Sequence, residues 1–124
     1  GSRLPALWTS LGRVILADKT DDEIREYIKL SDLSAKTSTT ITEPEVLLKE
    51  LQRIRKKGWA IVDQELEDGL ISIAAPIKDR QGRVIAAINI SGNAQRNTAE
   101  QIQETFLEPL LKASNLISNL IKKR

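Results

Sequence analysis

Three residue types that carry much of protein chemistry, cysteine, histidine and methionine, are absent from this sequence of 124 residues. Without cysteine there is no disulfide framework, no thiol nucleophile and no thiolate ligand for a metal. Without histidine there is no imidazole to act as a general base, a zinc ligand or a switch near neutral pH. We therefore expect no metal, no cofactor and no enzymatic activity of the common hydrolase or transferase kinds. The missing initiator methionine indicates a piece of a longer polypeptide.

Charge of one sign and long hydrophobic runs are also scarce. The sequence has 19 Lys and Arg against 17 Asp and Glu, a net charge of +2, which is too small to indicate a nucleic-acid-binding face. No apolar run approaches the ~18 residues that a membrane span needs, and no signal peptide is recognisable. We expect no membrane partner and a cytoplasmic protein. Apolar residues at 40% and charged residues at 29% are ordinary for one globular domain or part of one.

Three helix starts share the capping-box pattern, in which Ser or Thr is followed three residues later by Glu or Gln. The pattern predicts helices that begin at Thr20, Thr42 and Thr98. The second of these helices is expected to stop at Gly58, which suits a left-handed cap. The third runs to the C-terminus and contains Pro109, which predicts a kink or a division. Its apolar positions recur at helical spacing along one side: Ile102, Phe106, Leu110, Ala113, Ile117, Leu120 and Ile121.

Strand-forming segments occupy the middle of the sequence, at residues 59–62, 70–77 and 83–91. Residues 79–82 form a turn signal, so the two long segments are expected to pair as an antiparallel hairpin. A further helix is expected from about residue 9 or 10 to residue 17, and residues 31–42 have the composition of a loop. The strands cluster between helices and are joined by short turns, which predicts an α+β fold with an antiparallel sheet.

Polar residues in apolar surroundings give two candidate binding features. The first is the start of the first helix at Thr9, Ser10 and Leu11, where free backbone N–H groups favour an anion; the alternative is an ordinary N-cap. The second comprises Ser72 in one long strand with Asn89 and Ser91 in the facing strand. Side chains alternate along a strand, so residues 89 and 91 share a face. That face either meets solvent or lines a mixed pocket.

An acidic segment at residues 63–68 carries four carboxylates in six residues. Such a cluster can hold a hard cation, but the spacing is not that of an EF-hand, and an exposed acidic loop is the simpler interpretation. Asp63 directly follows an apolar strand, so its side chain is a candidate to point inward and would then need a hydrogen-bond partner. An enzyme with Asp63 and Glu65 as acid and base is a weaker alternative, because no nucleophile accompanies them.

Several blocks, taken in order, resemble IclR-type transcriptional regulators. The N-terminal block is Leu4-Pro5, Thr9-Ser-Leu-Gly12 and Leu16-Ala17. The central block runs from Leu47 to Asp63, with the pattern L-x-x-E-L-x-x-I-R-x-x-G-W-A-I-V-D, and continues through Glu65 and Gly69-Leu70. The C-terminal blocks are Ser72-Ile-Ala-Ala-Pro-Ile77, Gly82, Val84, Ala86-Ala87 and Asn89-Ile-Ser-Gly92. Within the family, the resemblance is greatest to the branch that regulates protocatechuate, p-hydroxybenzoate and β-ketoadipate metabolism.

The resemblance implies a GAF-like, or profilin-like, effector-binding domain whose curved antiparallel sheet is flanked by helices. Residues 1–124 would be most of that domain, without its N-terminal strands. The winged helix-turn-helix DNA-binding domain would be absent, so that contact with DNA would need that separate domain. The family also implies association into a homo-oligomer, a dimer or tetramer. A GAF-like dimerisation module without a small-molecule ligand is the alternative.

The resemblance also implies a set of ligand-binding positions: Thr9, Ser10, Leu11, Asp63, Leu70, Ser72, Asn89 and Ser91. Ser72 stands where the family often has Cys, and Asn89 stands where Ser is common. The pocket therefore keeps polar side chains, but its ligand can differ from the ligands of other family members. The implied ligand is a small carboxylate, with an aromatic one as a candidate, whose anion lies at the first helix start. Such a sensor needs no covalent step.

Overall fold

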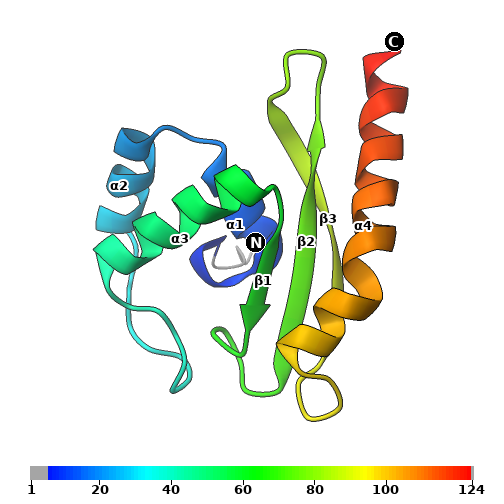
Figure 1. Ribbon diagram of the computed structural model, residues 1–124. Coiled ribbons are helices and arrows are strands. Elements are labelled where there is room, and N and C mark those ends of the chain that lie inside the picture. Colours follow the sequence, from blue (N-terminus) through cyan, green and yellow to red (C-terminus); the bar gives the residue numbers. More distant parts are fainter. Residues whose placement is uncertain (1–5, 124) are drawn as a thin grey trace, which may run out of the picture.

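The computed structural model describes residues 6–123, and Leu4-Pro5 of the family resemblance lies outside the described residues. The elements follow in the order η1 (Ala6–Trp8), α1 (Ser10–Ala17), α2 (Asp21–Lys29), α3 (Pro44–Lys57), β1 (Ala60–Asp63), β2 (Leu70–Lys78), β3 (Val84–Asn93) and α4 (Ala99–Lys122). Figure 1 shows α1, α2 and α3 on one side of the strands and α4 on the other. The α+β class and the antiparallel hairpin are thereby confirmed.

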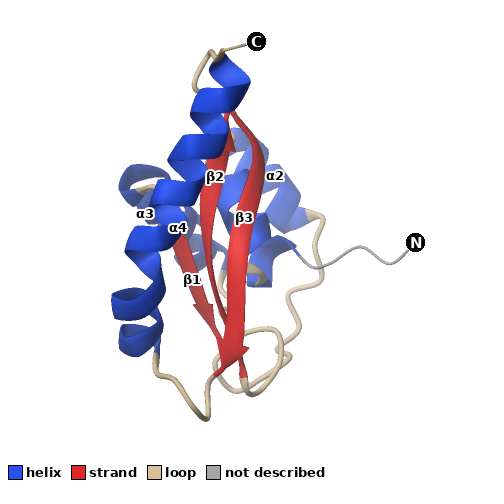
Figure 2. Ribbon diagram, turned by 90° about the vertical axis from the view of Figure 1, so that its right-hand side faces the viewer, coloured by secondary structure: helices blue, strands red, loops and turns tan. Residues whose placement is uncertain are grey.

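The sheet has three antiparallel strands in the order β1-β2-β3, and Figure 2 shows α4 lying along it. Its register places Val62 opposite Ser72 and Ser72 opposite Ser91, so these three side chains form one row across the sheet. Ala74 lies opposite Asn89 in the neighbouring row of the same face. This face is covered by the helices that precede the sheet.

Each face of the sheet has its own apolar core. The first core joins η1, α1, α2 and α3 to the sheet and includes Trp8, Leu51 and Ala74. The second joins α4 to the opposite face through Ile73, Ile102 and other residues. Because strand side chains alternate between faces, β2 contributes to both cores and is buried along most of its length.

Two of the three predicted capping boxes are confirmed. Thr20 and Thr98 each accept a hydrogen bond from the backbone N–H three residues later, and the reciprocal side-chain bond is also present. The prediction for Thr42 is wrong, since α3 has Glu43 as its N-cap, without a side-chain capping bond. Pro44 follows directly, and its fixed φ angle suits the first helical position, so proline rather than a capping box sets this helix start.

The last helix departs from its predicted packing. α4 is continuous through Pro109, and Figure 1 shows it changing direction rather than breaking. Ile102 and Leu110 are buried as predicted, but Ile117 and Leu120 are exposed. Ser114 and Ser118 are buried in their place. The buried residues of α4 are spaced by multiples of four throughout, so the row that faces the sheet continues from Leu110 into the two serines and not into the predicted apolar positions.

Candidate functional site

A polar row lies at the floor of the sheet face toward α1. The hydroxyls of Ser72 and Ser91 belong to directly opposed residues of β2 and β3. Asn89 lies two residues from Ser91, and its Nδ2 donates to Ser91 Oγ at 3.3 Å. Ser72 is 9% exposed, whereas Asn89 and Ser91 remain accessible. The row therefore offers hydroxyl and amide groups that can each make a further hydrogen bond.

The start of α1 faces this row. Thr9 is the N-cap, and its Oγ1 accepts from Gly12 N at 3.0 Å. The N–H groups of Ser10 and Leu11, at the first two helical positions, have no acceptor within the helix. A Cβ at Gly12 would lie 2.4 Å from the backbone of Ala6, so only glycine allows η1 to pack this closely against the helix start. This local packing fixes the direction of the free N–H groups.

Ser10 is the most informative residue at this helix start. Its relative exposure is 1%. Within residues 6–123, its Oγ is the buried side-chain polar atom found without a hydrogen-bond partner. An unpartnered buried hydroxyl costs about 1–3 kcal/mol, so such an atom in a native fold calls for an explanation. A ligand that accepts a hydrogen bond from Ser10 Oγ would provide one.

A cavity of ≈ 150 Å³ connects the helix start with the polar row. Its lining is Trp8, Thr9, Ser10, Leu11, Val62, Leu66, Leu70, Ser72, Asn89 and Ser91. Half of these residues have apolar side chains, and the others bring hydroxyls and an amide next to the helix start. Small-molecule sites commonly have this composition. Cavities of about 150 Å³ hold a molecule the size of benzene.

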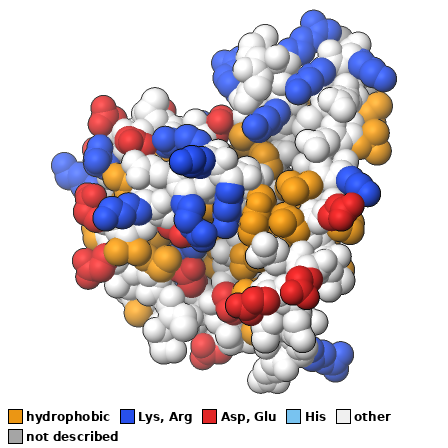
Figure 3. Space-filling model, viewed as in Figure 1, with side chains coloured by type: hydrophobic (Ala, Val, Ile, Leu, Met, Phe, Trp, Pro, Cys, Tyr) orange, Lys and Arg blue, Asp and Glu red, His pale blue; other side chains and the backbone are white. Residues whose placement is uncertain are grey.

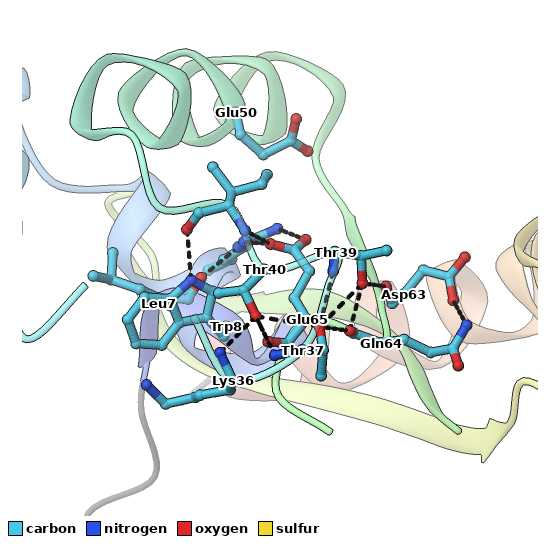
Figure 4. Close-up of polar contacts among 12 residues, drawn as sticks. Leu7, Trp8, Lys36, Thr37, Thr39, Thr40, Glu50, Asp63, Gln64 and Glu65 are labelled. Carbon is cyan, nitrogen blue, oxygen red and sulfur yellow. Dashed lines mark hydrogen bonds and ion pairs between the residues drawn. The ribbon is translucent and has the colours of Figure 1, made fainter. Parts of the chain in front are cut away.

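Seven of the eight predicted ligand-binding positions lie together around this cavity, and Asp63 does not. The Asp63 side chain is exposed, and its Oδ1 accepts from the Gln64 side chain at 3.3 Å. Figure 4 shows this pair pointing away from Trp8 and Glu65. The inward orientation considered for Asp63 is therefore wrong. Strand alternation explains it, because Val62 takes the inward position and lines the cavity instead.

The exposed position expected for the acidic segment is wrong for Glu65. Its carboxylate is buried and receives both Arg13 guanidinium N–H groups, at 2.8 and 2.7 Å. Arg13 Nε also donates to Leu7 O at 2.6 Å, and Ile41 N donates to Glu65 Oε1 at 3.0 Å. One ion pair thus ties together η1, α1, the 31–43 loop and the 64–69 loop, which carries Leu66. Arg13 is the one charged residue in α1. In the sequence, this isolated charge is the available signal that a buried carboxylate such as Glu65 lies nearby.

The 31–43 loop closes one side of the site. Trp8 Nε1 donates to Ile41 O at 2.9 Å, and Lys36 Nζ lies 4.0 Å from the centroid of the Trp8 ring. Thr40 Oγ1 donates to Glu65 O at 2.6 Å, and Figure 4 shows neighbouring threonines bonded to the same strand end. These contacts hold Trp8 at the cavity wall. Trp8, Val62 and Leu66 are the lining residues outside the predicted set.

Metal and membrane roles find no structural support in the part of the chain that is described. Residues 6–123 contain no group of three acidic side chains placed to hold a metal ion. No described helix has the length and apolar composition for crossing a bilayer.

Residues 1–119 match the family described as "Bacterial transcriptional regulator IclR C-terminal". The chain belongs to this family. It is 49% identical over 114 residues to the Pca regulon regulatory protein of Pseudomonas putida, covering 92% of this chain and 39% of that protein. It is 38% identical over 118 residues to the regulator KdgR of Escherichia coli, covering 95% of this chain and 44% of that protein.

Solved structures of IclR-type regulators have the same fold. The inducer-binding domain of PobR from Acinetobacter, a double mutant in complex with 3-hydroxybenzoic acid, superposes with a TM-score of 0.91 at 32% identity. That comparison covers 98% of this chain and 69% of the other. A transcriptional regulator from Rhodococcus sp. RHA1 gives 0.90 at 39% identity, covering 96% and 48%.

These relatives define the class of protein. They are named as transcriptional regulators, not as enzymes. The chain spans less than half the length of both curated relatives, so it corresponds to their C-terminal, IclR-type part. The geometry does not favour the enzyme interpretation with Asp63 and Glu65 as acid and base. Glu65 is occupied by Arg13, and Asp63 lies outside the cavity.

Proposed function

We propose that this chain is the effector-binding domain of a bacterial regulator and that its cavity binds a small carboxylate. The observation that carries the proposal is the buried Ser10 Oγ without a partner, at a helix N-terminus that opens onto a cavity. Helix N–H groups and a hydroxyl donor together favour an anion. The carboxylate would accept from the backbone N–H groups of Ser10 and Leu11 and from Ser10 Oγ.

The remaining lining residues favour a planar ring that carries a hydroxyl group in addition to the carboxylate. Val62, Leu66 and Leu70 provide apolar contacts across the middle of the cavity. Ser72 and Ser91 stand at the far end, where a ring hydroxyl would find hydrogen-bond partners. The PobR domain with 3-hydroxybenzoic acid and the Pca regulon protein support a ligand from aromatic catabolism. The family resemblance implies Asp63 as a ligand-binding position, but Asp63 would contact the ligand only if its loop rearranged.

Regulation would follow from a difference in affinity. A ligand shifts an equilibrium only as far as it binds one arrangement better than the other. The effector would therefore favour one arrangement of a homo-oligomer, a dimer or a tetramer, in the cytoplasm. A separate DNA-binding domain in the same regulator would make the contact with the operator.

Thermal unfolding of the intact regulator with a panel of acids tests the proposal. The panel comprises p-hydroxybenzoate, 3-hydroxybenzoate, protocatechuate, β-ketoadipate, glyoxylate and pyruvate. A ligand that binds the folded state raises the melting temperature in proportion to the logarithm of its concentration. We expect a rise with one or more monocarboxylates. Ser72→Ala should reduce it, while the exposed control Ser38→Ala should not. No rise with any acid would instead favour a module that only dimerises.

A further inference from the structure

Trp8 is the one aromatic side chain among the cavity-lining residues that the structure describes. It is also the bulkiest of them, and its relative exposure is 3%. The other lining side chains are aliphatic or small and polar. Since a cavity of ≈ 150 Å³ has room for about one six-membered ring, a larger ligand could enter only if this wall moved.

The Trp8 indole is held from outside the cavity. Its Nε1 donates to Ile41 O at 2.9 Å, and Lys36 Nζ lies 4.0 Å from the centroid of the ring. Figure 4 shows Lys36 beside Trp8, and Lys36 is not a lining residue. Its ammonium therefore covers a part of the ring that a ligand in the cavity does not contact. Rotation of the indole would break both the hydrogen bond and this contact.

The buried Arg13–Glu65 ion pair fixes both ends of this hydrogen bond. Arg13 Nε donates to Leu7 O at 2.6 Å, at the residue before Trp8. Ile41 N donates to Glu65 Oε1 at 3.0 Å, and the carbonyl of the same residue accepts from the indole. The backbone next to Trp8 and the partner of its side chain are thus tied to one salt bridge. A closely packed wall of this kind does not yield to an additional ring without a cost in free energy.

The described residues that line the cavity include no charged side chain. Figure 3 shows lysine, arginine and acidic side chains over the outer surface of the molecule instead. Along the ring of a ligand, the site can therefore select by size and shape but not through an ion pair. A flat indole also favours a flat ligand, because two aromatic rings in contact gain more than the area that they bury.

We infer that Trp8 is the specificity-determining residue of this cavity and that it restricts the ligands to acids with a single ring. The inference rests on the proposed function and adds an upper limit to the size of the effector. The ligand 4-hydroxy-1-naphthoate provides a sharp comparison with p-hydroxybenzoate. Both carry a carboxylate and a hydroxyl on opposite carbons of one ring, and the naphthoate adds a second ring at the side.

Calorimetric titration of the intact regulator with these two acids tests the inference. The parent should bind p-hydroxybenzoate at least about 30-fold more tightly, because several additional carbons must be accommodated in a filled site. Trp8→Phe should lower this ratio at least about fivefold by leaving space at the wall. Trp8→Leu should lower it further, and Trp8→Phe is the conservative variant that decides the test if Trp8→Leu does not fold.

The second tryptophan of the chain provides the matched control. A lysine also lies over the Trp59 ring, with Lys57 Nζ 3.9 Å from its centroid, but Trp59 packs against the core on the α4 side of the sheet. Trp59→Phe should therefore leave the ratio of affinities unchanged. Equal affinities of the parent for the two acids would overturn the inference. So would the same ratio in the parent, Trp8→Phe and Trp59→Phe.

Phenol and 1-naphthol separate the size limit from the choice of an acid, because they have the same rings without the carboxylate. If neither acid binds, but phenol binds better than 1-naphthol and Trp8→Phe reduces that difference, the proposed effector class is wrong and the size limit stands. If none of the four compounds binds, both the proposed function and the inference are overturned.

A fluorine label tests whether the ligand ring contacts Trp8. The intact regulator is produced with 5-fluorotryptophan, and Trp8→Phe and Trp59→Phe assign the two fluorine resonances of this chain. Saturation with p-hydroxybenzoate should shift the Trp8 resonance and leave the Trp59 resonance in place. A bound ligand that leaves the Trp8 resonance unchanged would contradict a role for Trp8 in specificity.

Discussion

Removing the charge of Glu65 tests whether one buried ion pair organises the site. Arg13 has a side-chain exposure of 1% and Glu65 of 10%, and the two make a bidentate contact. Glu65→Gln keeps the shape of the side chain but leaves the Arg13 guanidinium without its counter-charge. Breaking a buried pair in this way costs about 3–5 kcal/mol. We expect a loss of about 3 kcal/mol in the free energy of unfolding, since glutamine retains one oxygen acceptor.

Thermal unfolding followed by far-ultraviolet circular dichroism measures this loss. For a domain of this size, about 3 kcal/mol corresponds to a fall of about 12 °C in the melting temperature. Glu67→Gln is the matched control, because it makes the same chemical change at an exposed position of the same loop. It should leave the melting temperature within about 2 °C of the parent.

A double variant separates the effect of an unpaired buried charge from the effect of changing the side chains themselves. Arg13→Leu/Glu65→Leu should be less destabilised than Glu65→Gln, since it leaves no buried charge unpaired. A loss below about 1 kcal/mol in Glu65→Gln would place the pair in the range of exposed surface pairs. That result would refute the reasoning that this contact holds the loops around the cavity.

Three further variants test individual elements by thermal unfolding. Gly12→Ala should cost about 2 kcal/mol, because its Cβ would lie 2.4 Å from neighbouring backbone; a neutral result would contradict the close packing of η1. Thr98→Ala should cost about 1 kcal/mol by removing the α4 cap, whereas the exposed Thr105→Ala should not. The Arg55 hydrogen bond lowers the pKa of Asp21 below its ordinary 3.8. Asp21→Asn should therefore destabilise the fold above that pH, and the difference from the parent should vanish as pH falls through the lowered pKa.

Local sequence signals predicted much of the fold. The capping boxes at Thr20 and Thr98 satisfy helix N–H groups through residues only three positions away, so nothing distant decides them. The turn at residues 79–82 likewise predicted the β2–β3 hairpin. The register of that hairpin brings Ser72 opposite Ser91, and strand alternation adds Asn89 to the same face. The family resemblance then connected this face with the start of α1.

The errors arose where tertiary packing decides the outcome. Glu65 is indistinguishable from its acidic neighbours in sequence, because its partner Arg13 lies 52 residues away. A shift of one residue along the strand would turn Asp63 inward and Val62 outward. Which side chains point inward at the end of a short strand is therefore hard to predict from sequence. In α4, Leu120 fits the predicted apolar stripe, but the buried row continues through Ser114 and Ser118 and leaves Leu120 exposed.

Calorimetric titration of the intact regulator with p-hydroxybenzoate and its neutral amide, p-hydroxybenzamide, tests the central claim most directly. If the carboxylate lies at the start of α1, the acid should bind at least about tenfold more tightly than the amide, because charge-assisted hydrogen bonds contribute about 1.5–3 kcal/mol. Ser10→Ala should weaken the acid much more than the amide. Equal affinities for the two compounds, or an unchanged acid affinity in Ser10→Ala, would contradict an anion-binding role for this helix start.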